Sequence, residues 1–149
     1  MSIPFYKYHG TGNDFIIINK IENKNVQLNR GLISEMCHRR FGIGSDGLIE
    51  IFDSENYDFR MKYYNSDGFE GTMCGNGGRC AVAFANKMGL IDIKSEFEAV
   101  DGIHLAEIIK NENIKIKMQD VNEIKKLEDG YYINTGSPHF IKFVNDFTS

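Results

Sequence analysis

One short stretch of the sequence combines a cysteine with a high density of glycine. Residues 65–80 read Asn-Ser-Asp-Gly-Phe-Glu-Gly-Thr-Met-Cys-Gly-Asn-Gly-Gly-Arg-Cys, and five of these sixteen residues are glycine. Such a backbone can fold closely around a small ligand. Cys74 stands just before a predicted helix, where unpaired amides and the helix dipole favour an anion, and favour a thiolate over a thiol. The stretch therefore indicates a cysteine that could act as a general base, beside amides that could hold a carboxylate.

A second interpretation of the same stretch stays open on the residues alone. A glycine-rich turn often precedes a helix, and a single cysteine in such a turn can be purely structural. Cys80 follows Cys74 by six residues in the predicted helix, which puts it on another face, so we predict that it packs in the core. Cys37 falls on the apolar face of another predicted helix and is interpreted in the same way.

The cysteine count bears on cofactors and on location. The chain has three cysteines, an odd number, and no Cys-x-x-Cys spacing. Reduced thiols in the cytoplasm are the expected state. We therefore expect no structural disulfide and no metal site, zinc included.

Two further loops carry polar residues between glycines. Residues 9–15 read His-Gly-Thr-Gly-Asn-Asp-Phe, and residues 41–47 read Phe-Gly-Ile-Gly-Ser-Asp-Gly. Neither is a phosphate-binding P-loop, because no Lys-Ser/Thr pair follows the glycines. The second leads into a strand rather than out of one, so it does not match a Rossmann fingerprint. Each loop alone is typical of a tight turn with Asx hydrogen bonds.

Two helices are predicted to position these loops. Between Gly31 and Arg40 the apolar residues fall on one face, and the basic run 38–40 is interpreted as a helix C-terminus that complements the dipole. The second helix is expected from Asn76 to Met88, with Gly89 as its C-terminal cap. The centre of that helix, residues 81–85, is apolar all round, which is typical of a helix that is buried on every side.

Strand signals dominate the rest of the chain. Short aromatic or β-branched segments are predicted as strands; they are residues 5–8, 15–18, 48–52 and 59–63. Residues 103–109 and 114–118 flank Asn111-Glu112-Asn113 and predict a hairpin. The expected fold class is α+β, with mostly antiparallel strands wrapped around a central buried helix. Residues 124–127 are interpreted as a charged connection, and a new strand pair is expected at Tyr131 and Phe140.

Composition excludes several classes of partner. The chain has 149 residues, 42% of them apolar and 26% charged, with a formal net charge of −4. The sequence has no basic stripe that would indicate binding to nucleic acid or to an anionic membrane. The longest apolar runs are far too short to cross a bilayer, and the first residues lack a secretory signal. A small-molecule partner is indicated instead by the glycine-rich stretch, whose backbone can fold closely around a ligand.

Five motifs, in their order along the chain, resemble the diaminopimelate epimerase family. Each is weak alone, whereas five in order are highly specific. They are His9-Gly10-x-Gly12-Asn13-Asp14-Phe15, Gly42-Ile43-Gly44-x-Asp46, Asn65-x-Asp67-Gly68, Met73-Cys74-Gly75-Asn76-Gly77-x-Arg79-Cys80 and Gly136-Ser137-Pro138-His139. The resemblance covers essentially the whole chain but only the first half of the family's length.

The resemblance implies a fold of two similar halves with the active site in the cleft between them, and it implies no cofactor or metal. One cysteine from each half flanks the α-carbon of the substrate: one thiolate removes the α-proton and the opposite thiol delivers a proton to the other face. LL- and meso-diaminopimelate are interconverted, on the route to lysine and peptidoglycan. Cys74 matches the catalytic cysteine of the first half. Asn13 and Asn65 match substrate-contacting asparagines, and Gly75 and Asn76 match the amides that hold the α-carboxylate. A homodimer of the full-length protein is compatible with the resemblance.

Some features depart from the family pattern. Gly47 stands where many members have a substrate-contacting Gln, and Ser137 where many have an Asn. The family's second catalytic cysteine and the Glu-Arg pair before it do not occur in these residues. We therefore expect residues 1–120 to form the N-terminal epimerase domain and residues 121–149 to begin a second, truncated domain. On this view the 149 residues alone do not epimerise a substrate.

Two alternatives remain at this level. Another isomerase of the same fold, similar to a proline racemase or a phenazine-biosynthesis isomerase, would use the same kind of site. A non-catalytic binding domain, a remnant of an epimerase, would make the present length natural, whereas a piece of a longer enzyme would continue into a second cysteine motif.

Overall fold

The computed structural model describes residues 2–109 and 113–146. The chain divides into two units, Met1–Lys117 and Met118–Ser149.

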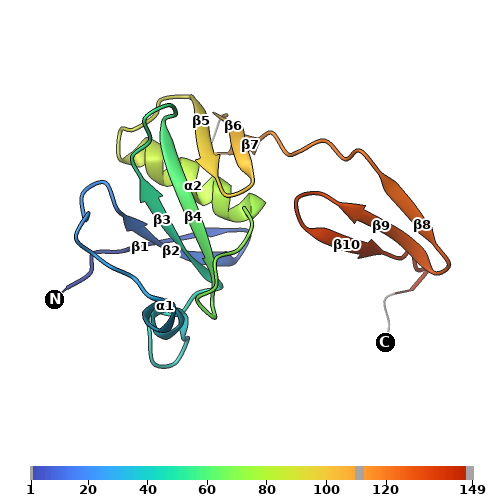
Figure 1. Ribbon diagram of the computed structural model, residues 1–149, viewed down its shortest axis with the longest axis horizontal. Coiled ribbons are helices and arrows are strands. Elements are labelled where there is room, and N and C mark those ends of the chain that lie inside the picture. Colours follow the sequence, from blue (N-terminus) through green and yellow to red (C-terminus); the bar gives the residue numbers. More distant parts are fainter. Residues whose placement is uncertain (1, 110–112, 147–149) are drawn as a thin grey trace. The chain divides into compact units, whose positions relative to one another are not determined.

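The first unit contains a seven-stranded sheet whose spatial order is the order of its strands in the chain (Figure 1). Its strands are β1 (Tyr6–Gly10), β2 (Asn13–Asn19), β3 (Gly47–Phe52), β4 (Phe59–Asn65), β5 (Lys94–Ala99), β6 (Gly102–Ile108) and β7 (Ile114–Ile116). The β2–β3 and β4–β5 pairs are parallel, and the other neighbouring pairs are antiparallel. A parallel pair needs a crossover connection. Helix α1 (Arg30–Cys37) lies in the first crossover and helix α2 (Gly75–Lys87) in the second.

The two helices pack on opposite faces of the sheet. In β2, Phe15 and Ile17 belong to the core that contains α2, whereas Ile16 and Ile18 belong to the smaller core that contains α1. Successive side chains of a strand point to opposite faces, so a strand covered on both sides becomes a continuous apolar run. All four of these residues are fully buried. The apolar run in the sequence therefore reflects the two layers that cover β2.

The direction of the strands explains this placement. Both crossovers advance the same way along the sheet, but β2 and β4 run in opposite directions because β3 pairs parallel with β2 and antiparallel with β4. Crossovers of the same hand that start from opposed strands put their helices on opposite faces.

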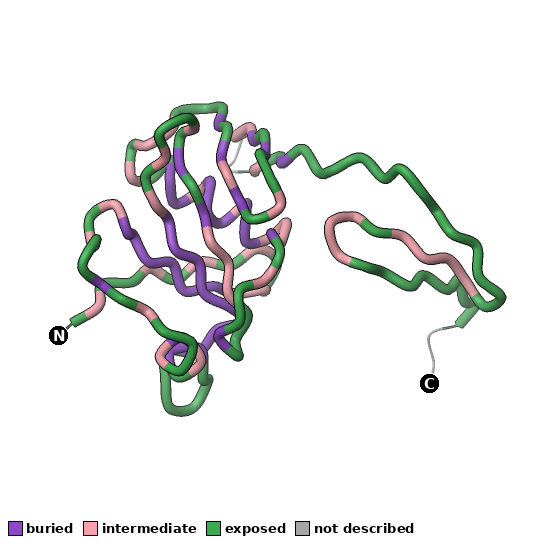
Figure 2. Tube along the Cα trace, viewed as in Figure 1, coloured by how far each residue is buried: buried purple, intermediate pink, exposed green. Residues whose placement is uncertain are grey.

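The sheet curls around α2, as Figure 1 shows. The helix contacts β1 and β7, the strands at the two edges of the sheet, as well as β2, β3 and β4. Ala81, Val82, Phe84 and Ala85 have no exposed surface, and the buried trace in Figure 2 runs through α2 and the central strands. The prediction of a central buried helix wrapped by mostly antiparallel strands is confirmed.

The ends of α2 follow from its sequence. The N–H of Gly89 donates to the carbonyl of Asn86, and the N–H of Leu90 donates to the carbonyl of Ala85. This pair of bonds is the Schellman motif, which requires a left-handed residue after the helix. Gly89 supplies it with φ of 72°, so the predicted C-terminal glycine is confirmed.

Helix α1 is shorter than the predicted segment. Asn29 caps its N-terminus by accepting a hydrogen bond from the N–H of Leu32, and Ile33, Met36 and Cys37 are buried as expected. The helix ends at Cys37 and has no basic residue in its last turn. The interpretation of residues 38–40 as a dipole-complementing C-terminus is therefore wrong.

The remaining strands of the first unit give one confirmation and one omission. Strands β6 and β7 form the predicted antiparallel hairpin, with Ile108 opposite Ile114; residues 111 and 112 of its turn lie outside the described residues. Strand β5 was not predicted, because Glu96 and Glu98 alternate with the buried Ser95 and Phe97 and make the segment appear polar.

The second unit contains a three-stranded antiparallel sheet, in the order β10-β9-β8. Its strands are β8 (Ile124–Leu127), β9 (Gly130–Asn134) and β10 (Pro138–Ile141). The predicted strand pair at Tyr131 and Phe140 is confirmed. The interpretation of residues 124–127 as a connection is wrong: they pair with β9 although all four are exposed. Lysine-rich composition hid a strand whose backbone hydrogen bonds do not depend on burial.

Candidate active site

Cys74 occupies the N-terminal cap of α2. Its backbone is extended, with φ of −91° and ψ of 131°, its side chain is half-buried, and it makes no capping hydrogen bond. In α1, by contrast, Asn29 fills the same capping position. The first turn of a helix presents amide N–H groups without intrahelical partners, and acidic or hydroxyl side chains usually satisfy them. Because Cys74 does not cap α2, this helix start keeps the amides of its first turn for other acceptors.

Asn13 brings the first glycine loop to this helix start. It begins β2 and lies opposite Gly10 in the β1–β2 hairpin. The Sγ of Cys74 donates to Oδ1 of Asn13 at 3.7 Å, and Nδ2 of Asn76 donates to the same oxygen at 3.3 Å. Three of the predicted site residues are therefore in direct contact.

Gly10 allows the two elements to approach. A Cβ atom at this position would lie 3.2 Å from Cβ of Asn76 and 3.3 Å from its Oδ1. These separations are shorter than ordinary van der Waals contacts, so any larger residue would push Asn76 away from β1.

Asp46 continues the cluster on the other side of Asn13. Its Oδ2 accepts a hydrogen bond of 2.8 Å from Nδ2 of Asn13. Its Oδ1 accepts one of 2.7 Å from Nη2 of Arg39. The hydrogen bond from Asn13, followed by the one from Arg39, lowers the pKa of the Asp46 carboxyl below its usual value. Asp46 is therefore a carboxylate, which can only accept hydrogen bonds.

Arg39 joins Asp46 to a second carboxylate. Its Nη2 lies 2.7 Å from Oδ1 of Asp14, and Lys7 forms a further ion pair with Asp14. The hydrogen bond from Arg39, the largest cause, holds the pKa of Asp14 well below its usual range, with Lys7 acting in the same direction. Lys7 also donates to the carbonyl of Gly44 at 2.6 Å, which ties the two glycine loops together.

The sequence interpretation missed Asp46, Arg39 and Lys7 as parts of this cluster. Asp14 and Asp46 each follow a glycine-containing loop and end up opposite each other because β2 and β3 are parallel neighbours: Phe15 pairs with Gly47. The sequence shows the two aspartates in matching Gly-x-Asp spacings, Gly12-x-Asp14 and Gly44-x-Asp46. It does not show that the strands that follow them pair with each other.

The other predicted residues lie near the cluster without joining it directly. Gly75 is the first residue of α2, next to Cys74. Asn65 ends β4 as an exposed residue opposite Gly47. A Cβ atom at Gly71 would lie 3.1 Å from Nδ2 of Asn65, so the loop after β4 folds back over that side chain. The described contacts do not join Asn65 to Asn13 or Cys74.

The tyrosine at position 63 fills the space at Gly47. A Cβ atom at Gly47 would lie 2.6 Å from the Tyr63 ring carbon Cε2 and 2.6 Å from the carbonyl oxygen of Tyr64. Tyr63 packs edge-on against Phe15, on the same core as Cys74. Burial raises the pKa of Tyr63 to about 12, so the phenol is neutral. A glutamine at position 47 would require Tyr63 and the Tyr64 backbone to move.

The other two cysteines are buried, as predicted. Cys37 and Cys80 expose 2% and 3% of their surface, and both are free thiols. Burial raises the pKa of Cys80 to about 11, and burial also raises the pKa of Cys37. Both are therefore protonated near neutrality, and Cys74 is the accessible thiol among the described residues.

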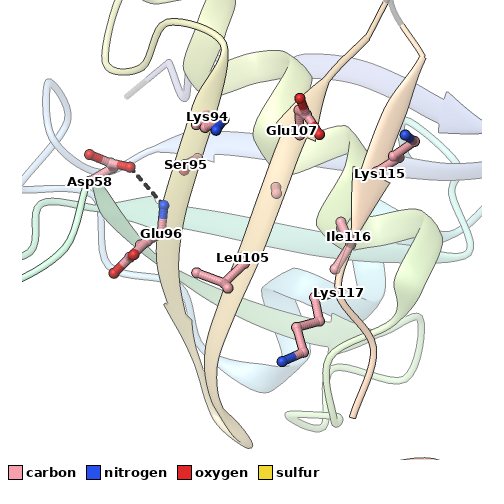
Figure 3. A pocket seen from close by; sticks show the side chains of 10 residues that line it. Asp58, Lys94, Ser95, Glu96, Leu105, Glu107, Lys115, Ile116 and Lys117 are labelled. Carbon is pink, nitrogen blue, oxygen red and sulfur yellow. Dashed lines mark hydrogen bonds between the residues drawn. The ribbon is translucent and has the colours of Figure 1, made fainter. Parts of the chain in front are cut away.

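A cavity of about 590 Å³ lies elsewhere, on strands β5–β7 (Figure 3). Its exposed lining side chains, among them Glu96, Leu105 and Lys117, alternate along the strands with core residues such as Ser95 and Ala106. None of the predicted site residues lines it.

Two features are absent from residues 2–109 and 113–146. No group of three or more His, Cys, Asp or Glu side chains is arranged to hold a metal ion. No helix in this part of the chain has both the length and the apolar character needed to span a bilayer.

Sequence comparison connects this chain to a known family. Residues 5–124 match the family model for diaminopimelate epimerase. A diaminopimelate epimerase of Flavobacterium psychrophilum is 48% identical over 147 residues, which is 99% of this chain and 57% of that protein. One of Chlorobaculum tepidum is 43% identical and covers 92% of this chain and 56% of that protein. The chain thus spans little more than half the length of these relatives.

Solved structures share the fold. A phenazine biosynthesis protein of the PhzF family from Bacillus anthracis superposes with a TM-score of 0.59 at 19% identity, over 86% of this chain and 43% of its own. A hydroxyproline epimerase from Agrobacterium vitis superposes with a TM-score of 0.58 at 10% identity, over 87% and 47%. At these identities the likeness concerns the fold alone. The family match over residues 5–124 decides the classification: this chain belongs to the diaminopimelate epimerase family.

Proposed function

We propose that the full-length protein interconverts LL- and meso-diaminopimelate without a cofactor, with Cys74 as one of two acid–base groups. The observation that carries the proposal is the placement of Cys74 at the uncapped start of α2, in contact with Asn13 and Asn76. Family membership supplies the substrate class.

The site chemistry suits proton abstraction next to a carboxylate. The Cys74 thiolate takes the α-proton, so the C–H bond breaks, an S–H bond forms and the electron pair stays on the substrate. A thiol on the opposite face then gives its proton to that carbon, which inverts the centre. The carbanion is stabilised if its carboxylate accepts hydrogen bonds from the amides of Gly75 and Asn76, because fixed dipoles stabilise charge strongly in a dry site.

The polar side chains around Cys74 would bind the rest of the substrate. Asn13 offers an amide beside Cys74, and Asn65 offers another at the end of β4. Diaminopimelate carries an ammonium and a carboxylate group at each end, and an amide side chain can donate to a carboxylate and accept from an ammonium group. We propose these two asparagines as substrate contacts.

The second acid–base group is proposed to come from sequence outside these 149 residues. The relatives are longer, since this chain covers 57% and 56% of the two described above. The described chain has one accessible thiol, because Cys37 and Cys80 are buried. The 149 residues alone are therefore expected not to epimerise diaminopimelate, and turnover by the purified chain would contradict this part.

The proposal extends to the setting of the reaction. Free thiols at Cys37, Cys74 and Cys80 suit the reducing cytoplasm. We propose a cytoplasmic enzyme of lysine and peptidoglycan precursor synthesis, and a homodimer as its assembled form.

The test is deuterium incorporation at the α-carbon of LL-diaminopimelate in heavy water, with the full-length gene product. Incorporation is expected for the unaltered protein and for Cys37→Ala, which removes a buried thiol on the other face of the sheet. Cys74→Ala should abolish it while leaving the thermal unfolding temperature nearly unchanged. Incorporation into proline or hydroxyproline, but not into diaminopimelate, would transfer the assignment to another isomerase of this fold. A folded protein that incorporates deuterium into none of these substrates would indicate a non-catalytic binding domain.

A further inference from the structure

The side-chain amide of Asn13 is held in one orientation by its neighbours. Its Nδ2 donates to Oδ2 of Asp46 at 2.8 Å, and its Oδ1 accepts from Asn76 at 3.3 Å and from Cys74 at 3.7 Å. A carboxylate cannot donate, so a flipped amide would place its oxygen against the oxygen of Asp46. The same flip would place the Asn13 amino group against the amino group of Asn76. Asp46 and Asn76 thus both select the orientation in which Oδ1 faces Cys74.

Asp46 is itself anchored from two sides. Arg39 donates to its Oδ1 at 2.7 Å, and the N–H of Asp14 donates to its Oδ2 at 3.3 Å. Its side chain keeps 44% of its surface exposed, so it adds little to the apolar core. Contacts of this kind fix the direction of a carboxylate rather than fill space.

We propose that Asp46 is a positioning residue, which acts through Asn13 to keep the Cys74 thiol engaged as a hydrogen-bond donor until substrate binds. The inference rests on the proposed function, because it assigns Asp46 to the same acid–base site. While the thiol donates to the amide oxygen of Asn13, its proton and one side of the sulfur are engaged by that contact. Substrate that hydrogen-bonds to Asn13 would take this acceptor away and release Cys74 for catalysis.

The positioning role of Asp46 can be distinguished from a general effect of its negative charge on Cys74. Removal of Asp46 also removes a negative charge near Cys74, and that alone would make the thiol more reactive. If Asp46 acts through Asn13, its removal has no further effect once Asn13 is gone. If it acts by its charge, the effect persists without Asn13. A double-mutant cycle distinguishes the two.

The experiment measures the rate of iodoacetamide alkylation at Cys74 in the full-length gene product at fixed pH, followed by peptide mass spectrometry. Asp46→Ala and Asn13→Ala are each expected to raise the rate about twofold, the factor at the low end of the range for a hydrogen bond, because a thiol is a weak donor. The double variant should react no faster than Asn13→Ala. Asp58→Ala is the matched control, because Asp58 accepts from the backbone N–H of Glu96 at 2.8 Å and lies outside the cluster; it should leave the rate unchanged.

Asp46→Asn provides a second variant if Asp46→Ala does not fold. It keeps the shape of the side chain but can also donate, so only Asn76 still opposes a flip of the Asn13 amide and the Cys74 rate should still rise. A rate equal to that of the unaltered protein in a folded Asp46 variant would overturn the proposal, as would full additivity with Asn13→Ala. Deuterium incorporation by the unaltered protein is measured in parallel, so a failure of the proposed function is seen separately from a failure of this inference.

Discussion

The Sγ atom of Cys74 lies 3.7 Å from Oδ1 of Asn13, although 61 positions separate the two residues in the chain. The contact exists because α2 packs across the β1–β2 hairpin, which brings the start of the helix to the start of β2. A strand that begins with a polar residue thus meets a helix whose N-terminal cap is a cysteine, and the candidate site lies at this junction.

The three thiols of the 149-residue chain should differ sharply in reactivity. Burial raises the pKa of Cys80 to about 11 and also raises the pKa of Cys37, whereas Cys74 is half-buried. Because the thiolate is the reactive form, iodoacetamide at pH 8 should modify Cys74 at least tenfold faster than the other two. Peptide mass spectrometry over a time course measures the three rates. Equal rates in the folded chain, with denatured chain as the control, would contradict the burial described here.

Two glycine substitutions should change stability in opposite directions. Gly89 has φ of 72° in the motif that ends α2, so Gly89→Ala should lower the free energy of unfolding by about 1–2 kcal/mol. Gly31 lies in the first turn of α1, where an added Cβ would meet only Oδ1 of Asn29, at 3.4 Å. Gly31→Ala should raise the free energy of unfolding by about 0.5–1 kcal/mol. Urea unfolding followed by circular dichroism tests both. If the free energy of unfolding changed in the same direction in both variants, the result would contradict the two backbone conformations.

Gly47 should not tolerate a side chain. Its Cβ would lie 2.6 Å from the Tyr63 ring and 2.6 Å from the Tyr64 carbonyl oxygen. Overpacking of this kind usually costs about 1–3 kcal/mol, so Gly47→Ala should lower the unfolding temperature clearly. Gly47→Gln should be at least as destabilising in this chain, because its side chain is larger. Differential scanning calorimetry measures both variants, and an unchanged transition would show that Tyr63 can move at no energetic expense.

Acid should weaken the ion-pair cluster at Asp14. Arg39 and Lys7 hold the pKa of Asp14 well below its usual range of about 4, so the folded state binds this proton less readily than the unfolded state. The stabilisation is therefore complete above about pH 5 and is lost as the pH falls from about 4 towards the low folded-state pKa. Asp14→Asn should destabilise the chain at pH 7, and the difference from the unaltered chain should shrink below pH 4. Urea titrations at pH 7, 5, 3 and 2 test this, with the exposed Asp92→Asn as control; a difference that stays constant with pH would refute it.

Local patterns predicted the elements that carry the site. The all-round apolar segment 81–85 predicted a buried helix, and α2 is buried there because strands from both edges of the sheet pack on it. Gly89 marked its end, and Cys74 was expected at its start. These signals are local: a cap, a left-handed glycine and a helical period each involve residues within a turn of one another.

Pairing between distant strands could not be read in this way. Strand β5 alternates glutamate with buried residues, and it joins the sheet by pairing with the parallel strand β4. Helix α2 separates these two strands along the chain. Arg39 was assigned to a helix terminus, but it lies beyond the helix and bridges Asp14 and Asp46. The pairing of β2 with β3 brings Asp14 and Asp46 together as the partners of Arg39. This pairing joins segments that are far apart in the chain.

The family, the catalytic candidate Cys74 and the helix that presents it follow from residue types at fixed short spacings, which can be read along the chain. The contacts of Cys74 and Asn76 with Asn13, the hydrogen bond from Asn13 to Asp46 and the packing of Tyr63 at Gly47 are evident only in the folded molecule. These contacts join β2, the loop before β3, β4 and the start of α2, which meet only after the sheet has curled around its central helix.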